Sequence, residues 1–207
     1  MRPQPQASAA PVKLNLSLAE TSVSRFFPLL GEGILVKGPG GGTVEDFLQK
    51  TAGVSPAYLK DRVQTVFLNG KALDDFKTAS VGDGATLALS AAMPGLAGAV
   101  LRRGGFYAAM RRQISHDVDD STPADQEITI TLKLFNLVAR DLGPGLLERG
   151  ILIPAGQLKD FIERQGRWIW AGCIAAQADG RPVETADVPV VLSGAGQVIL
   201  TVTARGG

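Results

Sequence analysis

The chain holds only one cysteine and one histidine among its 207 residues. A disulfide framework or a zinc cluster needs more of these residues than a single chain of this composition supplies. A formal net charge of +1 argues against a protein that holds nucleic acid mainly through bulk charge. No apolar run reaches the roughly 18 residues that a membrane-spanning helix needs. We therefore expect a soluble, cytoplasmic protein without a bound metal, whose partners include neither a membrane nor a nucleic acid.

Alternating apolar and polar residues predict several strands in the first half of the chain. Residues 1–11 are rich in proline, alanine and glutamine, and we expect them to form a disordered leader. Thr43 fits a helix N-cap with Asp46 in the capping-box position, and Gly53 is expected to end that helix. Strands are predicted over 12–18, 33–37, 64–68 and 85–89, with an Asn-Gly turn at 69–70 after the third.

The same order of elements recurs in the second half of the chain. Residues 128–134, 150–153, 158–162, 179–181 and 194–200 match 12–18, 33–36, 44–48, 69–71 and 82–89 in that order. We interpret this as two copies of one unit, because a solenoid or a propeller would need more copies. Residues 96–127 between the copies are predicted to form a basic, partly helical connector followed by an acidic linker.

The sequence closes with a strand-like run, 198–202, that leads into Arg205, Gly206 and Gly207. Two glycines at a free end have no side chains to bury and no intrinsic order. Such a tail can thread a narrow channel and present its α-carboxylate to an activating enzyme. The alternative is a frayed terminus without a function. The choice between the two depends on whether the preceding segments resemble proteins that use such a tail.

Two longer segments carry a resemblance to a known superfamily. Residues 66–89, "VFLNGKALDDFKTASVGDGATLAL", resemble the sulfur carriers of molybdopterin and thiamine synthesis. Residues 128–143, "ITITLKLFNLVARDLG", are similar to the opening of the molybdopterin-synthase small subunit, and Gly206-Gly207 resembles the end of those carriers and of ubiquitin. The resemblance implies an α+β fold of two tandem β-grasp (ubiquitin-like) domains, 12–95 and 128–207, each a mixed sheet with one packed helix.

The resemblance also implies a function without a catalytic site of the chain's own. The Gly207 carboxylate would be adenylylated by a ubiquitin-activating-type enzyme and then used as a thiocarboxylate sulfur donor. ATP would be used by that partner, no cofactor would be bound here, and a sulfur acceptor would complete the exchange. Conjugation of the tail to lysines of a target protein, and a scaffold that merely docks partners, are the two alternatives.

A few other residues are candidates for binding or chemistry. Trp168 and Trp170 alternate with Ile169, which predicts a strand that presents both rings on one side, either as packing or as a partner surface. Cys173 lies in an apolar segment and is expected to be a buried, unreactive thiol. Four residues of the basic connector could extend this partner surface: Arg102, Arg103, Phe106 and Tyr107. The alternative is that they form a solvated helix face.

Overall fold

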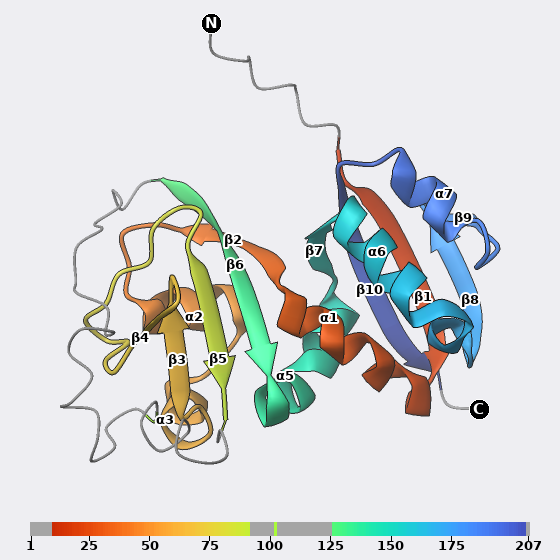
Figure 1. The fold of residues 1–207 in the computed structure, drawn as a ribbon. Coiled ribbons are helices and arrows are strands. Elements are labelled where there is room, and N and C mark those ends of the chain that lie inside the picture. Colours follow the sequence, from red (N-terminus) through yellow and green to blue (C-terminus); the bar gives the residue numbers. More distant parts are fainter. Residues whose placement is uncertain (1–9, 92–101, 103–125, 206–207) are drawn as a thin grey trace, which may run out of the picture. The chain divides into compact units, whose positions relative to one another are not determined.

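The computed structural model describes residues 10–91, 102 and 126–205, which form an α+β protein (Figure 1). The ten strands of the described residues form a mixed sheet, and the chain divides into two compact units with five of these strands each. Unit 1 comprises Met1–Leu29 and Pro144–Gly207, whereas unit 2 comprises Leu30–Gly143. Two helices, α1 (Phe27–Glu32) and α5 (Asn136–Arg149), cross the boundaries of this division. No helix in the described ranges is long and apolar enough to span a membrane.

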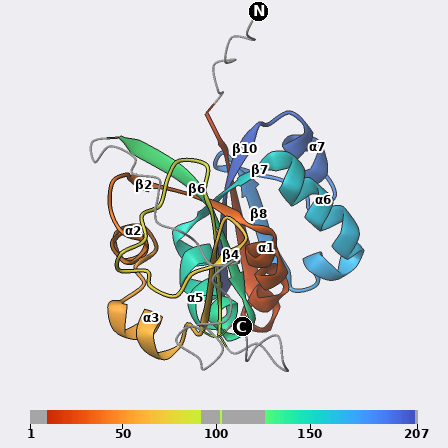
Figure 2. The same ribbon diagram turned by 60° about the vertical axis from the view of Figure 1, so that its left-hand side comes forward.

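The sheet of unit 2 has the strand order β4-β3-β5-β6-β2. Its central strands β5 and β6 are parallel, whereas β2 and β3 run antiparallel to their inner neighbours. Helices α2 and α3 lie on one face of this sheet (Figure 2). The elements of the unit are β2 (Ile34–Pro39), α2 (Val44–Ala52), α3 (Pro56–Asp61), β3 (Thr65–Leu68), β4 (Lys71–Ala72), β5 (Thr86–Ser90) and β6 (Glu127–Phe135).

Local signals in unit 2 act as the sequence predicts. The Thr43 hydroxyl accepts a hydrogen bond from the Asp46 amide at 3.1 Å, and the Asp46 carboxylate accepts one from the Thr43 amide. This reciprocal pair satisfies two amides that an α-helix leaves unpaired at its start. Gly53 ends α2 in the left-handed conformation, with φ of 67°. Asn69 and Gly70 both have positive φ, as a tight hairpin between β3 and β4 requires.

The sheet of unit 1 has the strand order β7-β10-β1-β8-β9. The parallel pair at its centre is β1 and β10, with β7 antiparallel to β10 and β8 antiparallel to β1. Helices α6 and α7 lie on one face of this sheet (Figures 1 and 2). The elements of the unit are β1 (Val12–Ala19), η1 (Glu20–Phe26), β7 (Ile151–Pro154), α6 (Ala155–Gln165), η3 (Gly166–Trp170), β8 (Cys173–Ala178), β9 (Arg181–Pro182), α7 (Val188–Ser193) and β10 (Gln197–Arg205).

The core of unit 1 follows from alternation in its two central strands. Every second residue of β1 and β10 is buried over most of their length, whereas the residues between them are wholly or partly exposed. Phe161 of α6 meets Phe26 of η1 with ring centroids 6.1 Å apart. The buried strand residues are Leu14, Leu16, Leu18, Val198, Leu200 and Val202.

The arrangement of the sheets differs from the predicted tandem division into 12–95 and 128–207. Strand β1 of the first predicted half lies between β10 and β8 of the second, and β6 lies between β2 and β5 of the first. The two halves thus exchange their first strands. Alternation could not reveal this, because β1 and β6 carry the same pattern and either one satisfies either sheet.

The exchange predicts which strands each core residue stabilises. Leu16 of β1 and Leu132 of β6 are each 1% exposed, so truncation to alanine should cost about 2–5 kcal/mol. We expect Leu16→Ala to accelerate amide hydrogen exchange in β8 and β10, and Leu132→Ala to accelerate it in β2 and β5. Hydrogen-exchange mass spectrometry of the two variants checks this. Faster exchange in β2 and β5 upon Leu16→Ala would contradict the exchanged pairing.

Candidate functional site at the end of β10

Strand β10 is the element that carries the predicted tail. It pairs with β7 from Gln197 to Leu200 and with β1 along its whole length to Arg205. Beyond Leu200 it is therefore paired with β1 on one side, without a residue of β7 on the other. The Thr203 hydroxyl adds a side-chain hydrogen bond to the pairing of β10 with β1, because it donates to the Leu16 carbonyl at 3.4 Å.

The last two residues of β10 are exposed, although they still pair with β1. Val202 is buried, but Ala204 and Arg205 are both exposed. Arg205 is the one member of the predicted carrier tail that the structure describes, since Gly206 and Gly207 lie outside the described residues. The site therefore consists of a firmly paired strand whose final residues have left the core.

The segment that follows β1 borders the base of the tail. Ala19, the register partner of Arg205, donates its amide hydrogen bond to the Gly172 carbonyl at 2.8 Å. The Ser22 hydroxyl of η1 donates to the Ala171 carbonyl at 3.0 Å. Gly172 has φ of +83°, and a Cβ at this position would collide with the Ser22 hydroxyl. Glycine is thus required where η1 approaches the turn before β8.

An arginine joins η1 to the candidate tryptophan surface. The Arg25 guanidinium donates to the carbonyl oxygens of Trp168, at 2.9 Å, and of Ala171. It also lies 4.9 Å from the centre of the Trp168 ring, within the range of a cation–π contact. Trp168 nevertheless remains 53% exposed, so much of its ring is free for other contacts.

The predicted strand over the two tryptophans is wrong. Trp168 and Trp170 lie in the 3-10 helix η3, with Ile169 fully buried between them. Trp168 is exposed and Trp170 is half-buried, so the two rings do not form one evenly presented face. Alternation over only three residues fits a 3-10 turn as well as a strand, which explains the misreading.

The other predicted residues contribute less to this site. Arg102 is exposed, whereas Arg103, Phe106 and Tyr107 lie outside the described residues. Cys173 begins β8 and is only half-buried, so the prediction of a fully buried thiol is wrong; this partial burial still raises the pKa of the thiol. Raising the pKa lowers the thiolate fraction, which agrees with an unreactive cysteine. Within the described ranges, no three side chains of histidine, cysteine, aspartate or glutamate gather where a metal could bind.

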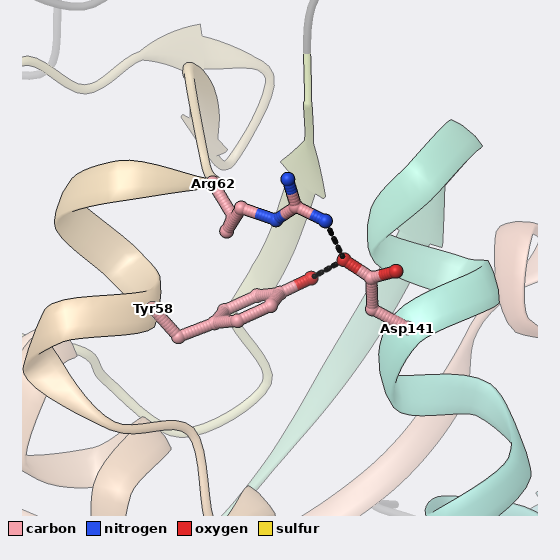
Figure 3. A network of polar contacts seen from close by, with 3 residues as sticks. All are labelled: Tyr58, Arg62 and Asp141. Carbon is pink, nitrogen blue, oxygen red and sulfur yellow. Dashed lines mark hydrogen bonds and ion pairs between the residues drawn. The ribbon is translucent and has the colours of Figure 1, made fainter.

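Unit 2 contains a polar network that the sequence reasoning missed (Figure 3). The Tyr58 hydroxyl of α3 donates to the Asp141 carboxylate of α5 at 3.0 Å, and Arg62 approaches the same oxygen at 3.4 Å. Burial, followed by the contact with Asp141, raises the pKa of Tyr58 to about 12. The network links two helices through residues about 80 positions apart in sequence, a distance over which local patterns carry no signal. It keeps the phenol neutral, so we assign it to structure.

The Tyr58 network predicts a measurable titration. Removing the carboxylate in Asp141→Asn should lower the pKa of Tyr58 from about 12 toward its ordinary value of 10.0. Since a raised pKa favours the protonated phenol in the folded state, its stabilising effect should persist below pH 10 and disappear as the pH rises through 12. Ultraviolet difference titration of the parent and variant, each with Tyr58→Phe as the blank, isolates this tyrosine from Tyr107. An unchanged midpoint would exclude a contribution from Asp141.

None of the protein-family models, curated proteins or solved structures with which the chain was compared matches it. Its function is therefore argued from its own residues.

Proposed function

We propose that this chain is a carrier protein that presents Arg205, Gly206 and Gly207 to an adenylylating enzyme. One observation carries the proposal: β10 is paired at the centre of its sheet and becomes exposed at Ala204 and Arg205, immediately before the glycine pair. Such a strand supplies a rigid base, whereas glycines supply a narrow extension without side chains. The proposal requires Gly207 to be the C-terminal residue of the mature protein.

The arrangement of each sheet supports a β-grasp assignment for both units. In each, two parallel strands occupy the centre, antiparallel strands flank them, and helices cover one face. The exchange of β1 and β6 leaves this plan intact, because each strand replaces another of the same direction and pattern. The sequence resemblance to sulfur carriers, and not the sheet alone, leads from this plan to the chemistry of the tail.

The proposed chemistry takes place on the terminal carboxylate. One carboxylate oxygen of Gly207 attacks the α-phosphorus of ATP in the partner enzyme, which forms an acyl adenylate and releases pyrophosphate. A hydrosulfide-level donor then attacks the carbonyl carbon and expels AMP, so that sulfur replaces one oxygen. The resulting thiocarboxylate passes its sulfur to an acceptor. Each step is an acyl or phosphoryl substitution, so the oxidation state of the Gly207 carbonyl carbon does not change. The chain itself supplies only the acyl group.

The residues beside the tail are proposed to bind the activating partner. Trp168 offers a large, exposed ring whose orientation Arg25 fixes from one side. Exposed Arg167 of η3 and Arg205 of β10 add positive charge to the segments around it. Tryptophan and arginine are enriched among residues that dominate binding energy at protein interfaces. A complementary partner surface would therefore carry carboxylates around an apolar pocket.

Conjugation to lysine is the second candidate function. The observation that favours it is the presence of two units in one chain, since sulfur delivery needs only one carrier domain. In this chemistry the activated carbonyl passes to a partner thiol and then to a lysine amine, which forms an isopeptide bond. Both functions share the activation step at Gly207 and differ in the nucleophile that follows.

The decisive measurement is the intact mass of the full chain isolated from its native source. A thiocarboxylate should raise the mass of the C-terminal peptide by about 16 Da, whereas conjugation should leave a Gly-Gly remnant on a lysine of another protein. Deleting Gly206 and Gly207 should abolish both products. An alanine appended after Gly207 is the matched control, because it keeps both glycines but displaces the carboxylate. An unmodified Gly207, or a mature chain that does not end there, would overturn the carrier proposal.

The surface beside the tail is tested separately. Trp168→Ala should lower kcat/KM for activation by the partner roughly 5- to 30-fold, because one interface anchor contributes about 1–2 kcal/mol. The carbonyl of residue 168 remains available to Arg25, so the melting temperature should stay near that of the parent. Val190→Ala removes another exposed apolar side chain of unit 1 and should change neither value. Equal losses in the two variants would show that Trp168 has no specific role.

A further inference from the structure

The outer edge of β8 is only partly covered by its neighbour. On one side β8 pairs with β1, but on the other β9 pairs with Gln177 and Ala178 alone. One further contact follows, in which the Val183 amide donates to the Ala176 carbonyl at 3.0 Å. The preceding residues, Cys173 to Ala175, are paired with no residue of β9. An uncovered edge presents backbone donors and acceptors to any extended chain that approaches it.

A bulge makes one residue of this edge especially accessible. The register with β1 shifts between Ser17 and Leu18, whose partners are Ala175 and Cys173. Ile174 lies between these two paired residues and has no register partner in either β1 or β9. Its side chain is 55% exposed. The extra residue of a bulge is left out of the ladder, and bulges often occur where a strand edge has a function.

A groove of about 410 Å³ runs beside this edge. Its lining comes from β8, residues 173–177, and from Pro182 of β9 with the segment that follows it, residues 183–185. The β8 wall carries the small side chains of Ala175 and Ala176, so an added strand could approach the backbone closely. Proteins commonly protect such edges with charged residues or proline. Pro182 does so on β9, but residues 173–177 of β8 contain neither.

The charge of the groove indicates its occupant. Among the described residues that line it, Glu184 alone is charged. An edge-to-edge pair with a second copy of this chain would bring two Glu184 carboxylates to one interface, and like charges there are unfavourable. A basic side chain on the incoming strand would instead meet an opposite charge. The groove thus favours a different, basic partner over self-association.

We propose that the edge of β8 binds an extended peptide segment of a partner protein, with a lysine or arginine directed toward Glu184. The segment adds a strand beside Cys173–Ala175, so backbone hydrogen bonds supply affinity and the Glu184 contact supplies selectivity. Its side chains next to Ala175 are apolar or small. This binding does not require the tail, so it goes beyond the carrier function and holds whether or not Gly207 is activated.

The test uses the full chain, labelled with ¹⁵N, and two capped pentapeptides. The first is threonine-valine-lysine-valine-threonine, and the second has glutamate in place of lysine. We expect the lysine peptide to shift the amide signals of residues 173–176 and 183–185 and to slow hydrogen exchange at Ile174. The glutamate peptide should bind about five- to tenfold more weakly, because it meets Glu184 with like charge.

A charge reversal supplies the control. Glu184→Lys should invert the preference, so that the glutamate peptide binds more tightly than the lysine peptide. Glu148→Lys makes the same change of charge at an exposed position of α5 outside the groove and should leave the preference unchanged. Shifts located elsewhere, shifts without slower exchange at Ile174, or no shifts with either peptide would each overturn the proposal.

Discussion

The parallel pairing of β1 with β10 is the constraint on which unit 1 depends. It joins residues 186 positions apart in sequence, and closing a loop of that length costs roughly 5 kcal/mol. The pairing also brings together leucine and valine side chains that are almost fully buried, each contributing about 1.5–3 kcal/mol. Burial in these two strands alone therefore offsets the cost of closure. Because β1 and β10 lie between β7 and β8, the strands β8 and β9 connect to β7 only through them.

This constraint links the exchange of first strands to the proposed tail. The base of the tail is held by β1, since β7 stops pairing with β10 at Leu200. The last paired residue, Arg205, is in register with Ala19, which is in turn bound to Gly172. The N-terminal strand thus positions the C-terminal segment, and η1 follows from it directly to Arg25 and Trp168. A tail in a simple tandem arrangement would instead depend on β6.

Local features could be predicted from the sequence, whereas strand partners could not. The Thr43–Asp46 capping box, the left-handed Gly53 and the Asn69–Gly70 turn each depend on neighbours within a few residues. Most predicted strands occur close to their expected bounds for the same reason. The sheet in which a strand lies depends on contacts distant in sequence, and alternation in β1 and β6 is compatible with both sheets. Helices α1, α3, α5 and α7 were not predicted, since three of them are six residues long and α5 contains an internal proline that normally ends a helix. In the candidate site, the roles of Arg205 and Trp168 remain predictions from the sequence, whereas the contact of Arg25 with Trp168 is visible only in the tertiary structure.

The tail and the β8 edge belong to the same end of the same sheet. Strand β1 separates β10 from β8, and neighbouring strands lie about 4.8 Å apart, so two spacings place them about 10 Å apart. The register confirms the shared end, because Arg205 is level with Ala19 and Ala19 is bound to Gly172, one residue before Cys173. A protein interface of ordinary size covers about 800 Å² on each partner, which is wide enough to include both features. A partner that receives the tail would therefore also reach the open edge of β8. If that partner supplies the basic extended segment, strand addition at β8 would fix the register of the sheet from which the tail emerges, and a single protein would recognise the fold and the reactive end together.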